Sequence, residues 1–166
     1  MKKLLILDVS KCTGCESCVV SCSISKEGVF DPIRSRIQVF RDESKGLVIP
    51  FFCEQCEEPP CIEACPVNAT EKDVERGIVI VNSELCTGCG SCVEACPYNG
   101  VRVNSKSKVA IICDLCGGEP LCAKVCVPSK AITCVTYSDE TFREKVKNAK
   151  KKIATFNSIK EDFGGN

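Results

Sequence analysis

The chain has 166 residues, enough for one domain or two small fused ones, and its 22 lysines and arginines balance its 22 aspartates and glutamates. This balance gives no reason to expect nucleic acid or an anionic membrane as a partner. Seventeen residues are cysteine and none is histidine, which excludes Cys-x-x-Cys-His haem attachment, Rieske ligation, Cys₂His₂ fingers and histidine-activated nucleophiles.

Cysteine at this density would suggest a disulfide scaffold in a secreted chain. However, the opening apolar run is too short for a signal peptide and Asp8 interrupts it, and the sequence has no twin-arginine pair or membrane-length apolar stretch. We therefore expect a protein of the reducing cytoplasm, in which grouped cysteines bind metal. With aromatic residues at 5%, the organic core is thin, so bound cofactors would supply part of the folding energy.

The first half of the chain carries two groups of four cysteines, each preceded by predicted strands. Residues 2–9 predict a buried strand, and residues 36–41 and 47–52 predict a hairpin. Between the first strand and the hairpin, residues 24–35 include turn-forming residues and are expected to be irregular. The gaps between cysteines are two, two and three residues in the first group (loop one) and two, four and three in the second (loop two). The cysteines are Cys12, Cys15, Cys18 and Cys22 in loop one, and Cys53, Cys56, Cys61 and Cys65 in loop two.

The second half repeats this arrangement. Residues 70–77 are polar, residues 77–82 predict a strand, residues 100–104 and 109–112 predict a hairpin, and residues 131–136 predict a last strand. The cysteine gaps are two, two and three residues in loop three and two, five and three in loop four. The cysteines are Cys86, Cys89, Cys92 and Cys96 in loop three, and Cys113, Cys116, Cys122 and Cys126 in loop four.

Loop three matches the bacterial ferredoxin run, in which three thiolates bind one [4Fe–4S] cube and the fourth serves a neighbouring cube. Gly88 and Gly90 let the backbone approach the inorganic sulfides, and Pro97 stops helix continuation after the fourth cysteine. Loop two also ends in Cys-Pro, whereas loop one has Ser23 in that place and loop four has its proline displaced to Pro128. These departures bear on loop geometry but not on ligation.

From Ser138 the chain becomes polar and basic, and a C-terminal helix is predicted. Thr141 and Glu144 have the spacing of a capping box. One helical face is apolar and lysines are expected to cover the rest. The apolar face holds Phe142, Val146, Ala149 and Ile153, and the lysines are Lys145, Lys147 and Lys150–Lys152. Because apolar anchors are few, we expect the helix to dock on the body or on a partner subunit rather than on a membrane or nucleic acid.

Sixteen of the seventeen cysteines form four complete groups, which suffices for four [4Fe–4S] clusters. In a nested pairing, loops two and three share two clusters, and loops one and four share the others. In the alternative tandem pairing, loop one pairs with loop two, and loop three with loop four. The nested pairing is favoured because only residues 66–85 separate loops two and three, as in a two-cluster ferredoxin. It assigns Cys12, Cys15, Cys18 and Cys126 to cluster 1; Cys53, Cys56, Cys61 and Cys96 to cluster 2; Cys86, Cys89, Cys92 and Cys65 to cluster 3; and Cys113, Cys116, Cys122 and Cys22 to cluster 4.

The predicted fold is α+β, a duplicated bacterial-ferredoxin-like fold with short antiparallel hairpins and cluster-binding loops, followed by a C-terminal helix. The polyferredoxin body covers residues 1–137. Its inner module spans about residues 50–104 and its outer module combines residues 1–30 and 105–137. Residues 138–166 form the helical extension.

The order of the four groups resembles the four-cluster iron–sulfur subunits of the dimethyl sulfoxide reductase and formate dehydrogenase type. The segment Glu57-Glu58-Pro59-Pro60-Cys61 and the longer gap Gly117 to Leu121 carry this resemblance, which covers about residues 3–136. It implies the nested pairing. In its compact length, the chain is similar to small cytoplasmic members of anaerobic metabolism. These accompany tungsten-dependent aldehyde oxidoreductases, the first expectation here, or carbon monoxide dehydrogenases, formate dehydrogenases or hydrogenases.

These features predict an electron-transfer subunit rather than an enzyme, because full cysteine quartets leave no iron with an open position. Catalysis would reside on a large partner subunit, and electrons would leave to a soluble ferredoxin or a flavin subunit. Surface clusters at both ends would also permit copies of the chain to stack. An alternative of a different class is a structural zinc module, although zinc sites favour two separated cysteine pairs. The remaining Cys134 lies in an apolar strand and is expected to be a small buried hydrophobe.

Overall fold

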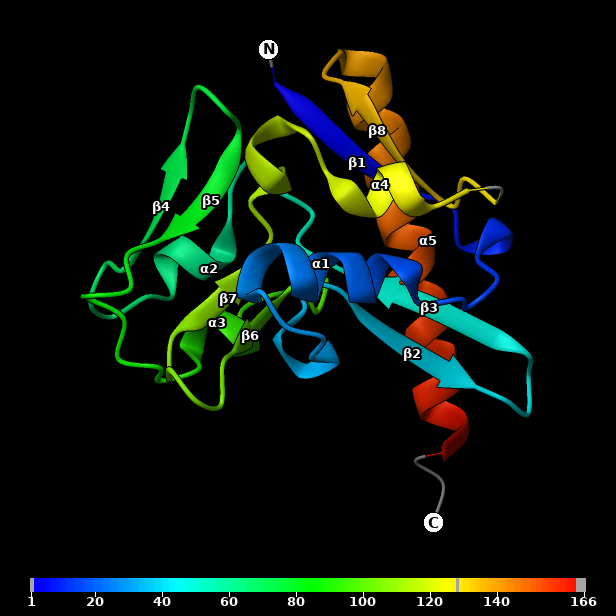
Figure 1. Ribbon diagram of the computed structural model, residues 1–166, viewed down its shortest axis with the longest axis horizontal. Coiled ribbons are helices and arrows are strands. Elements are labelled where there is room, and N and C mark those ends of the chain that lie inside the picture. The colour runs from blue at the N-terminus through cyan, green and yellow to red at the C-terminus, as the bar shows by residue number, and fades with distance from the viewer. Residues whose placement is uncertain (1, 128, 164–166) are drawn as a thin grey trace.

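The structure, a computed structural model, describes residues 2–127 and 129–163, and for residues 160–163 it describes the backbone alone. Pro128, the displaced proline expected after loop four, lies outside the described residues. The molecule is α+β: in the described part, short strands pair as antiparallel two-stranded sheets, and a long C-terminal helix runs past β1 and the β2–β3 hairpin (Figure 1). The pairs are β1 (Lys3–Leu7) with β8 (Ile132–Thr136), β2 (Gln38–Asp42) with β3 (Leu47–Phe51), β4 (Thr70–Asp73) with β5 (Ile78–Val81), and β6 (Val101–Val103) with β7 (Ala110–Ile112).

Each cysteine loop runs into a helix whose second residue is the third cysteine of that loop. The helices are α1 (Ser17–Glu27), α2 (Pro60–Glu63), α3 (Ser91–Glu94) and α4 (Leu121–Val125). Short 3₁₀ turns lie at Val9–Lys11, Pro32–Arg34 and Leu115–Gly118. The four loops therefore share one local plan, which places each third thiol at the N-terminal end of a helix.

The two ends of the chain pack against each other, and the middle of the chain lies beside them (Figure 1). β1 and β8 are far apart in sequence yet pair directly, and α1 packs against α4 (Figure 1). In the middle of the chain, α2 packs against α3. The main core mixes apolar side chains such as Ile37, Phe52 and Val79 with buried cysteines of the loops. Loop one thus lies beside loop four, and loop two beside loop three.

The predicted strands are confirmed with shifts of one or two residues at their ends, but β4 was missed. Its sequence, Thr70–Asp73, is polar, and only the pairing with β5 reveals it as a strand. Thr70 is buried while Glu71 is exposed, so one face of this short strand meets the core and the other meets solvent. A four-residue strand is too short for this alternation to stand out in the sequence.

The expectation that residues 24–35 are irregular is wrong for residues 24–27, because α1 continues to Glu27. It ends at Gly28, whose φ of 69° is the left-handed conformation of a helix cap. Ser23 explains the extension, since its peptide lacks the proline ring that would stop the helix. The Ser23 side chain is fully buried, donates to the Val20 carbonyl (3.1 Å) and accepts from the Asp31 N–H (3.3 Å).

The C-terminal helix α5 (Asp139–Phe163) begins earlier than the predicted capping box requires. Ser138 caps it: the Thr141 N–H donates to Ser138 Oγ at 3.1 Å, and the Ser138 N–H donates to Thr141 Oγ1 at 2.8 Å. The assignment of the box to Thr141 and Glu144 is therefore wrong by one turn, because the Thr141 hydroxyl performs the reciprocal role usually taken by an acidic side chain.

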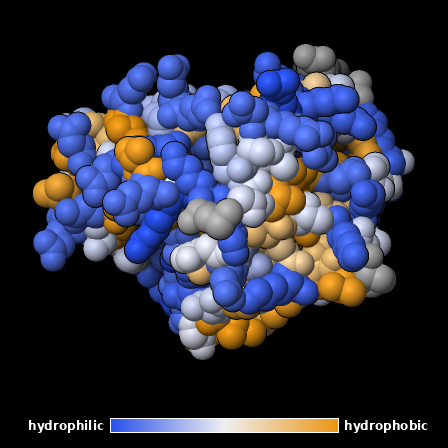
Figure 2. Space-filling view, turned by 90° about the horizontal axis from the view of Figure 1, so that it is seen from above, coloured by the Kyte–Doolittle hydropathy of each residue, from blue (hydrophilic) through white to orange (hydrophobic). Residues whose placement is uncertain are grey.

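Helix α5 docks on the body through a second, smaller core. Phe156 packs edge-on against Phe40 and Phe51, with ring centroids 5.0 and 4.9 Å apart. No helix in residues 2–127 and 129–163 is long and apolar enough to cross a membrane. Hydrophilic residues cover most of the face seen from above, interrupted by apolar patches (Figure 2). Large exposed apolar side chains include Phe30 and Ile33, which follow α1.

Candidate iron–sulfur centres

The outer loops place fourth cysteines beside the first three cysteines of the other loop. The pKa of Cys18 is raised to about 12, mainly by burial and also by the charges of Cys12 and Cys126. Burial likewise raises the pKa of Cys122, with contributions from Cys113, Cys116 and Cys22. Two groups therefore converge, one formed by loop one with Cys126 and the other by loop four with Cys22.

The inner loops behave in the same way. The pKa of Cys61 is raised to about 11, mainly by burial, and among the neighbouring thiols Cys96 contributes most. Burial also raises the pKa of Cys92, and Cys86, Cys89 and Cys65 add to it. Cys96 thus lies with loop two, and Cys65 with loop three.

Neighbouring groups also approach one another. The charge of Cys18 adds to the raised pKa of Cys122, that of Cys113 adds to the raised pKa of Cys53, and that of Cys92 adds to the raised pKa of Cys61. In every case burial is the largest cause. The four groups accordingly form a continuous series, from loop one through loop four and loop two to loop three.

The chemistry of these groups suits an iron–sulfur cofactor. Buried thiols that repel one another's charge resist ionisation, whereas a bound metal deprotonates its thiol ligands outright. A cationic iron core would relieve both the burial and the mutual repulsion. Within the described residues, no set of three or more histidine, cysteine, aspartate or glutamate side chains has the arrangement of a single-ion site.

Backbone N–H groups donate to the sulfur of every fourth cysteine. The donor–sulfur distances lie between 3.2 and 3.3 Å. The pairs are Arg36 with Cys22, Ala69 with Cys65, Gly100 with Cys96, and Ile132 with Cys126. Such bonds fix the sulfur position and, in iron–sulfur proteins, help to set the reduction potential. Sequence reasoning missed these donors because they depend on how the chain returns after each helix.

Two glycines allow close backbone approach in these loops. A Cβ at Gly100 would lie 2.6 Å from Cys53 Cα, so only glycine lets the segment after Cys96 pack against loop two. A Cβ at Gly88, whose φ is 69°, would collide with the Lys108 carbonyl. Glycine at position 88, expected to let the backbone approach the inorganic sulfides, is therefore also required for packing against the β6–β7 connection.

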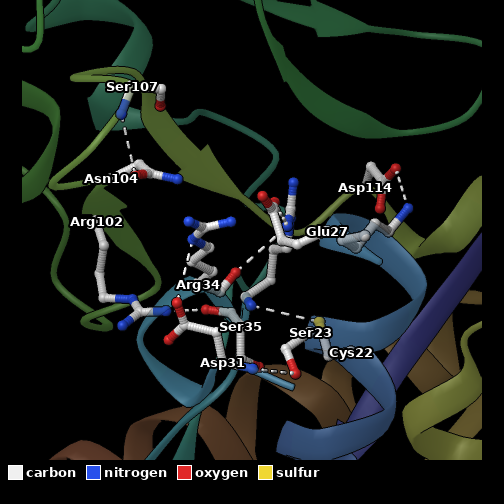
Figure 3. A network of polar contacts seen from close by, with 12 residues as sticks. Cys22, Ser23, Glu27, Asp31, Arg34, Ser35, Arg102, Asn104, Ser107 and Asp114 are labelled. Carbon is white, nitrogen blue, oxygen red and sulfur yellow. Dashed lines mark hydrogen bonds and ion pairs between the residues drawn. The ribbon is translucent and has the colours of Figure 1, made fainter. Parts of the chain in front are cut away.

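The surroundings of Cys22 tie loop one to loop four (Figure 3). Lys26 of α1 forms an ion pair of 2.6 Å with Asp114, the neighbour of Cys113. Burial alone would raise the pKa of Asp114, but the hydrogen bonds from Lys26 and from the Cys116 N–H lower it overall. The long form of α1 is needed for this contact, since Lys26 lies beyond the point at which a proline would have ended the helix.

Loop two is held by three lysines and a glutamine. Lys152 Nζ lies 2.5 Å from Glu54 Oε1, Lys145 Nζ donates to the Glu54 carbonyl, and Lys72 Nζ donates to the Cys56 carbonyl. Gln55 links loop two to loop four, because its amide donates to the Cys113 carbonyl and accepts from the Val79 N–H at 2.7 Å.

The expectation that lysines only cover the solvent side of the C-terminal helix is wrong for two of them. Lys145 and Lys152 are 4% and 1% exposed, whereas Lys147 and Lys150 are exposed as expected. Lys145 and Lys152 stand seven residues apart and therefore share a helical face. The available sequence signal was that both lysines share a helical face with Ala149, which is buried. Lysine side chains are rarely buried, however, and the sequence pattern indicated no charged partner for either of them.

Cys134 belongs to none of the four loops; it lies on β8 opposite Leu5 of β1 and is half-buried. Burial raises its pKa, and Lys3 opposes this. We expect Cys134→Ser to leave iron and acid-labile sulfide per chain unchanged, measured after anaerobic purification. Loss of iron from this variant would mean that Cys134 is a ligand.

Comparison with known proteins agrees with this geometry. Residues 44–139, more than half of the chain, match the model of the 4Fe-4S dicluster domain, and residues 9–26 match that of a 4Fe-4S binding domain. The chain belongs to the 4Fe-4S dicluster domain family. It is an iron–sulfur electron-transfer protein of the ferredoxin type, as expected, rather than a catalytic subunit.

Relatives of this dicluster protein are named as subunits of oxidoreductases. It is 43% identical over 122 residues to the polyferredoxin-like subunit of an aliphatic sulfonate oxidoreductase from Pyrococcus furiosus, covering 74% of this chain and 70% of that one. It is 37% identical over 135 residues to a subunit of the tetrathionate reductase of Salmonella typhimurium, covering 74% of this chain but 54% of that one. It thus spans only about half of the second relative.

Among solved structures, one chain of the active site complex BamBC of benzoyl coenzyme A reductase is 26% identical, with a TM-score of 0.46. The match covers 80% of this chain and 78% of that chain.

Proposed function

We propose that this dicluster-family protein carries electrons through four [4Fe–4S] clusters arranged in one row, between a catalytic oxidoreductase subunit and a second carrier. The observation that carries the proposal is the continuous series of thiol groups described above. A [4Fe–4S] cluster exchanges one electron with little change in its atomic positions, so clusters at short spacing can pass electrons from one to the next.

The nested ligand assignment is part of this proposal. The proximity of Cys126 to loop one, Cys22 to loop four, Cys96 to loop two and Cys65 to loop three supports it. The row would then run from cluster 1 through clusters 4 and 2 to cluster 3. The helix pairs α1–α4 and α2–α3 support an outer and an inner ferredoxin module of a duplicated body, with residues 138–166 as an extension.

The two ends of the row differ from its middle in exposure. Cys15 of cluster 1 and Cys89 of cluster 3 are exposed. The middle clusters draw most of their ligands from buried cysteines, which are Cys53, Cys61, Cys113, Cys122 and Cys22. Electrons would therefore enter and leave at clusters 1 and 3, where partners can approach.

The partner is proposed from the family resemblance. We place the chain with the cytoplasmic iron–sulfur subunits of the dimethyl sulfoxide reductase and formate dehydrogenase type, with a tungsten-dependent aldehyde oxidoreductase as first candidate. Carbon monoxide dehydrogenase, formate dehydrogenase and hydrogenase partners are the alternatives. The likeness to the subunit of a sulfonate oxidoreductase supports a catalytic partner of the oxidoreductase class.

Anaerobic purification from the native cells tests this function. We expect about four iron atoms and four sulfides per cluster, with a large catalytic subunit that copurifies. Tungsten or molybdenum in that subunit would support the first candidate, and nickel would support the carbon monoxide dehydrogenase or hydrogenase alternatives. A colourless chain that contains zinc and no acid-labile sulfide would overturn the proposal in favour of a structural zinc module.

A further inference from the structure

Helix α5 reaches into the candidate site at loop two through buried cations. Lys145 is 4% exposed, and its ammonium group donates to the main-chain carbonyl of Glu54, next to Cys53. Lys72, from the half-buried β4, donates to the main-chain carbonyl of Cys56. The loop that carries two of the proposed cluster 2 ligands is therefore held by two ammonium groups, one from α5 and one from β4.

Within the described part of the chain, neither ammonium group has a carboxylate partner, because no acidic side chain there lies within ion-pair distance of Lys145 or Lys72. Glu54, which is 6% exposed, directs its carboxylate to Lys152 at 2.5 Å rather than to Lys145. A buried charge without a partner is costly, so the fold must supply a counter-charge at this place.

The negative charges near these lysines are carboxylates beyond ion-pair distance and the thiol groups of loop two. Burial lowers the pKa of both lysines, and this is opposed by Glu54, Cys56 and Cys53 at Lys145 and by Cys56, Cys53 and Glu57 at Lys72. A [4Fe–4S] cluster with four thiolates is an anion, and each added electron makes it more negative. A fixed cation in a poorly solvated position favours the reduced form, because little water screens it.

Resting on the proposed function, we propose that Lys145 and Lys72 set the reduction potential of the cluster held by Cys53, Cys56, Cys61 and Cys96, making that cluster easier to reduce. They act through charge near the cluster and not as ligands. Two cations at other loops differ: Lys26 beside loop four is paired with Asp114 at 2.6 Å, and Arg41 beside loop one is paired with Glu16 at 2.7 Å. Their charge is largely offset.

The test is an anaerobic redox titration of the full chain with its clusters, followed by electron paramagnetic resonance. In Lys145→Met, we expect one cluster to become harder to reduce, with its ratio of reduced to oxidised form lowered about tenfold at any fixed potential. Lys72→Met should move the same cluster in the same direction. The other clusters should titrate as in the unmodified chain.

Two controls separate charge from structure. Lys147→Met removes an exposed lysine of the same helix and should move no cluster, and Lys145→Arg keeps the charge and should restore the titration. Iron and sulfide per chain are measured first, so that a variant that has lost its cluster is recognised. If Lys145→Met has lost its cluster, the titrations of Lys72→Met and Lys145→Arg test the inference instead.

Unchanged titrations in both lysine variants with full iron content would overturn the inference, as would an equal shift of all clusters. Either result leaves the proposed function standing. That function fails separately if the unmodified chain contains no iron–sulfur clusters.

Discussion

The double variant Cys12→Ala/Cys126→Ala is expected to lose no more iron than either single variant. In the nested arrangement these cysteines are 114 positions apart in sequence but serve one cluster. Loss of cluster 1 removes about four of about sixteen iron atoms, so the second substitution has no further cluster to remove. Residues that act as one unit in this way are strongly non-additive.

The matched double variant Cys86→Ala/Cys126→Ala should lose about eight iron atoms, because its two cysteines serve clusters 3 and 1. Iron and acid-labile sulfide per chain, determined under anaerobic conditions, measure both variants. The tandem pairing of loop three with loop four reverses the expectation, since Cys86 and Cys126 would then share a cluster. Additive loss in the first variant and non-additive loss in the second would contradict the nested arrangement.

Lys152→Met is expected to lower the free energy of unfolding by about 3–5 kcal/mol, the cost of removing one partner of a buried ion pair. The Lys152 and Glu54 side chains are 1% and 6% exposed and lie 2.5 Å apart. Removing the ammonium group leaves the Glu54 carboxylate buried and without its charged partner. For a chain of this length, such a change lowers the unfolding temperature by roughly 10 °C.

Anaerobic thermal unfolding, followed by circular dichroism and by cluster absorbance, measures this effect. The control is Lys124→Met, because Lys124 and Glu119 form an ion pair of the same 2.5 Å length but are 56% and 72% exposed. That exposed pair should contribute little, because water screens the two charges. The double variant Lys152→Met/Glu54→Gln should recover part of the loss. Equal, small effects of Lys152→Met and Lys124→Met would mean that α5 is not locked to loop two by this pair.

Local patterns predicted much of this molecule. The spacing of the cysteines is read directly from the sequence, so it predicted the four loops and the iron–sulfur character of the chain. Alternating and apolar runs predicted the strands because the periodicity of side chains is a local property. The polar strand β4 has no such local pattern and was therefore not predicted. The continuation of α1 past Ser23 could have been predicted from the missing proline, but the turn-forming residues beyond it outweighed that signal.

What the sequence alone determined was the chemistry of each loop: which thiols stand together along the chain, and that they suit cubes of iron and sulfur. Only the tertiary structure decided which loop faces which, how the four groups follow one another, and that Lys145 and Lys152 turn inward to Glu54. Those features depend on contacts between residues as distant as Glu54 and Lys152, and on how the burial of a charge is compensated. A sequence pattern shows neither the partner of a buried lysine nor the loss of solvent that strengthens the effect of its charge.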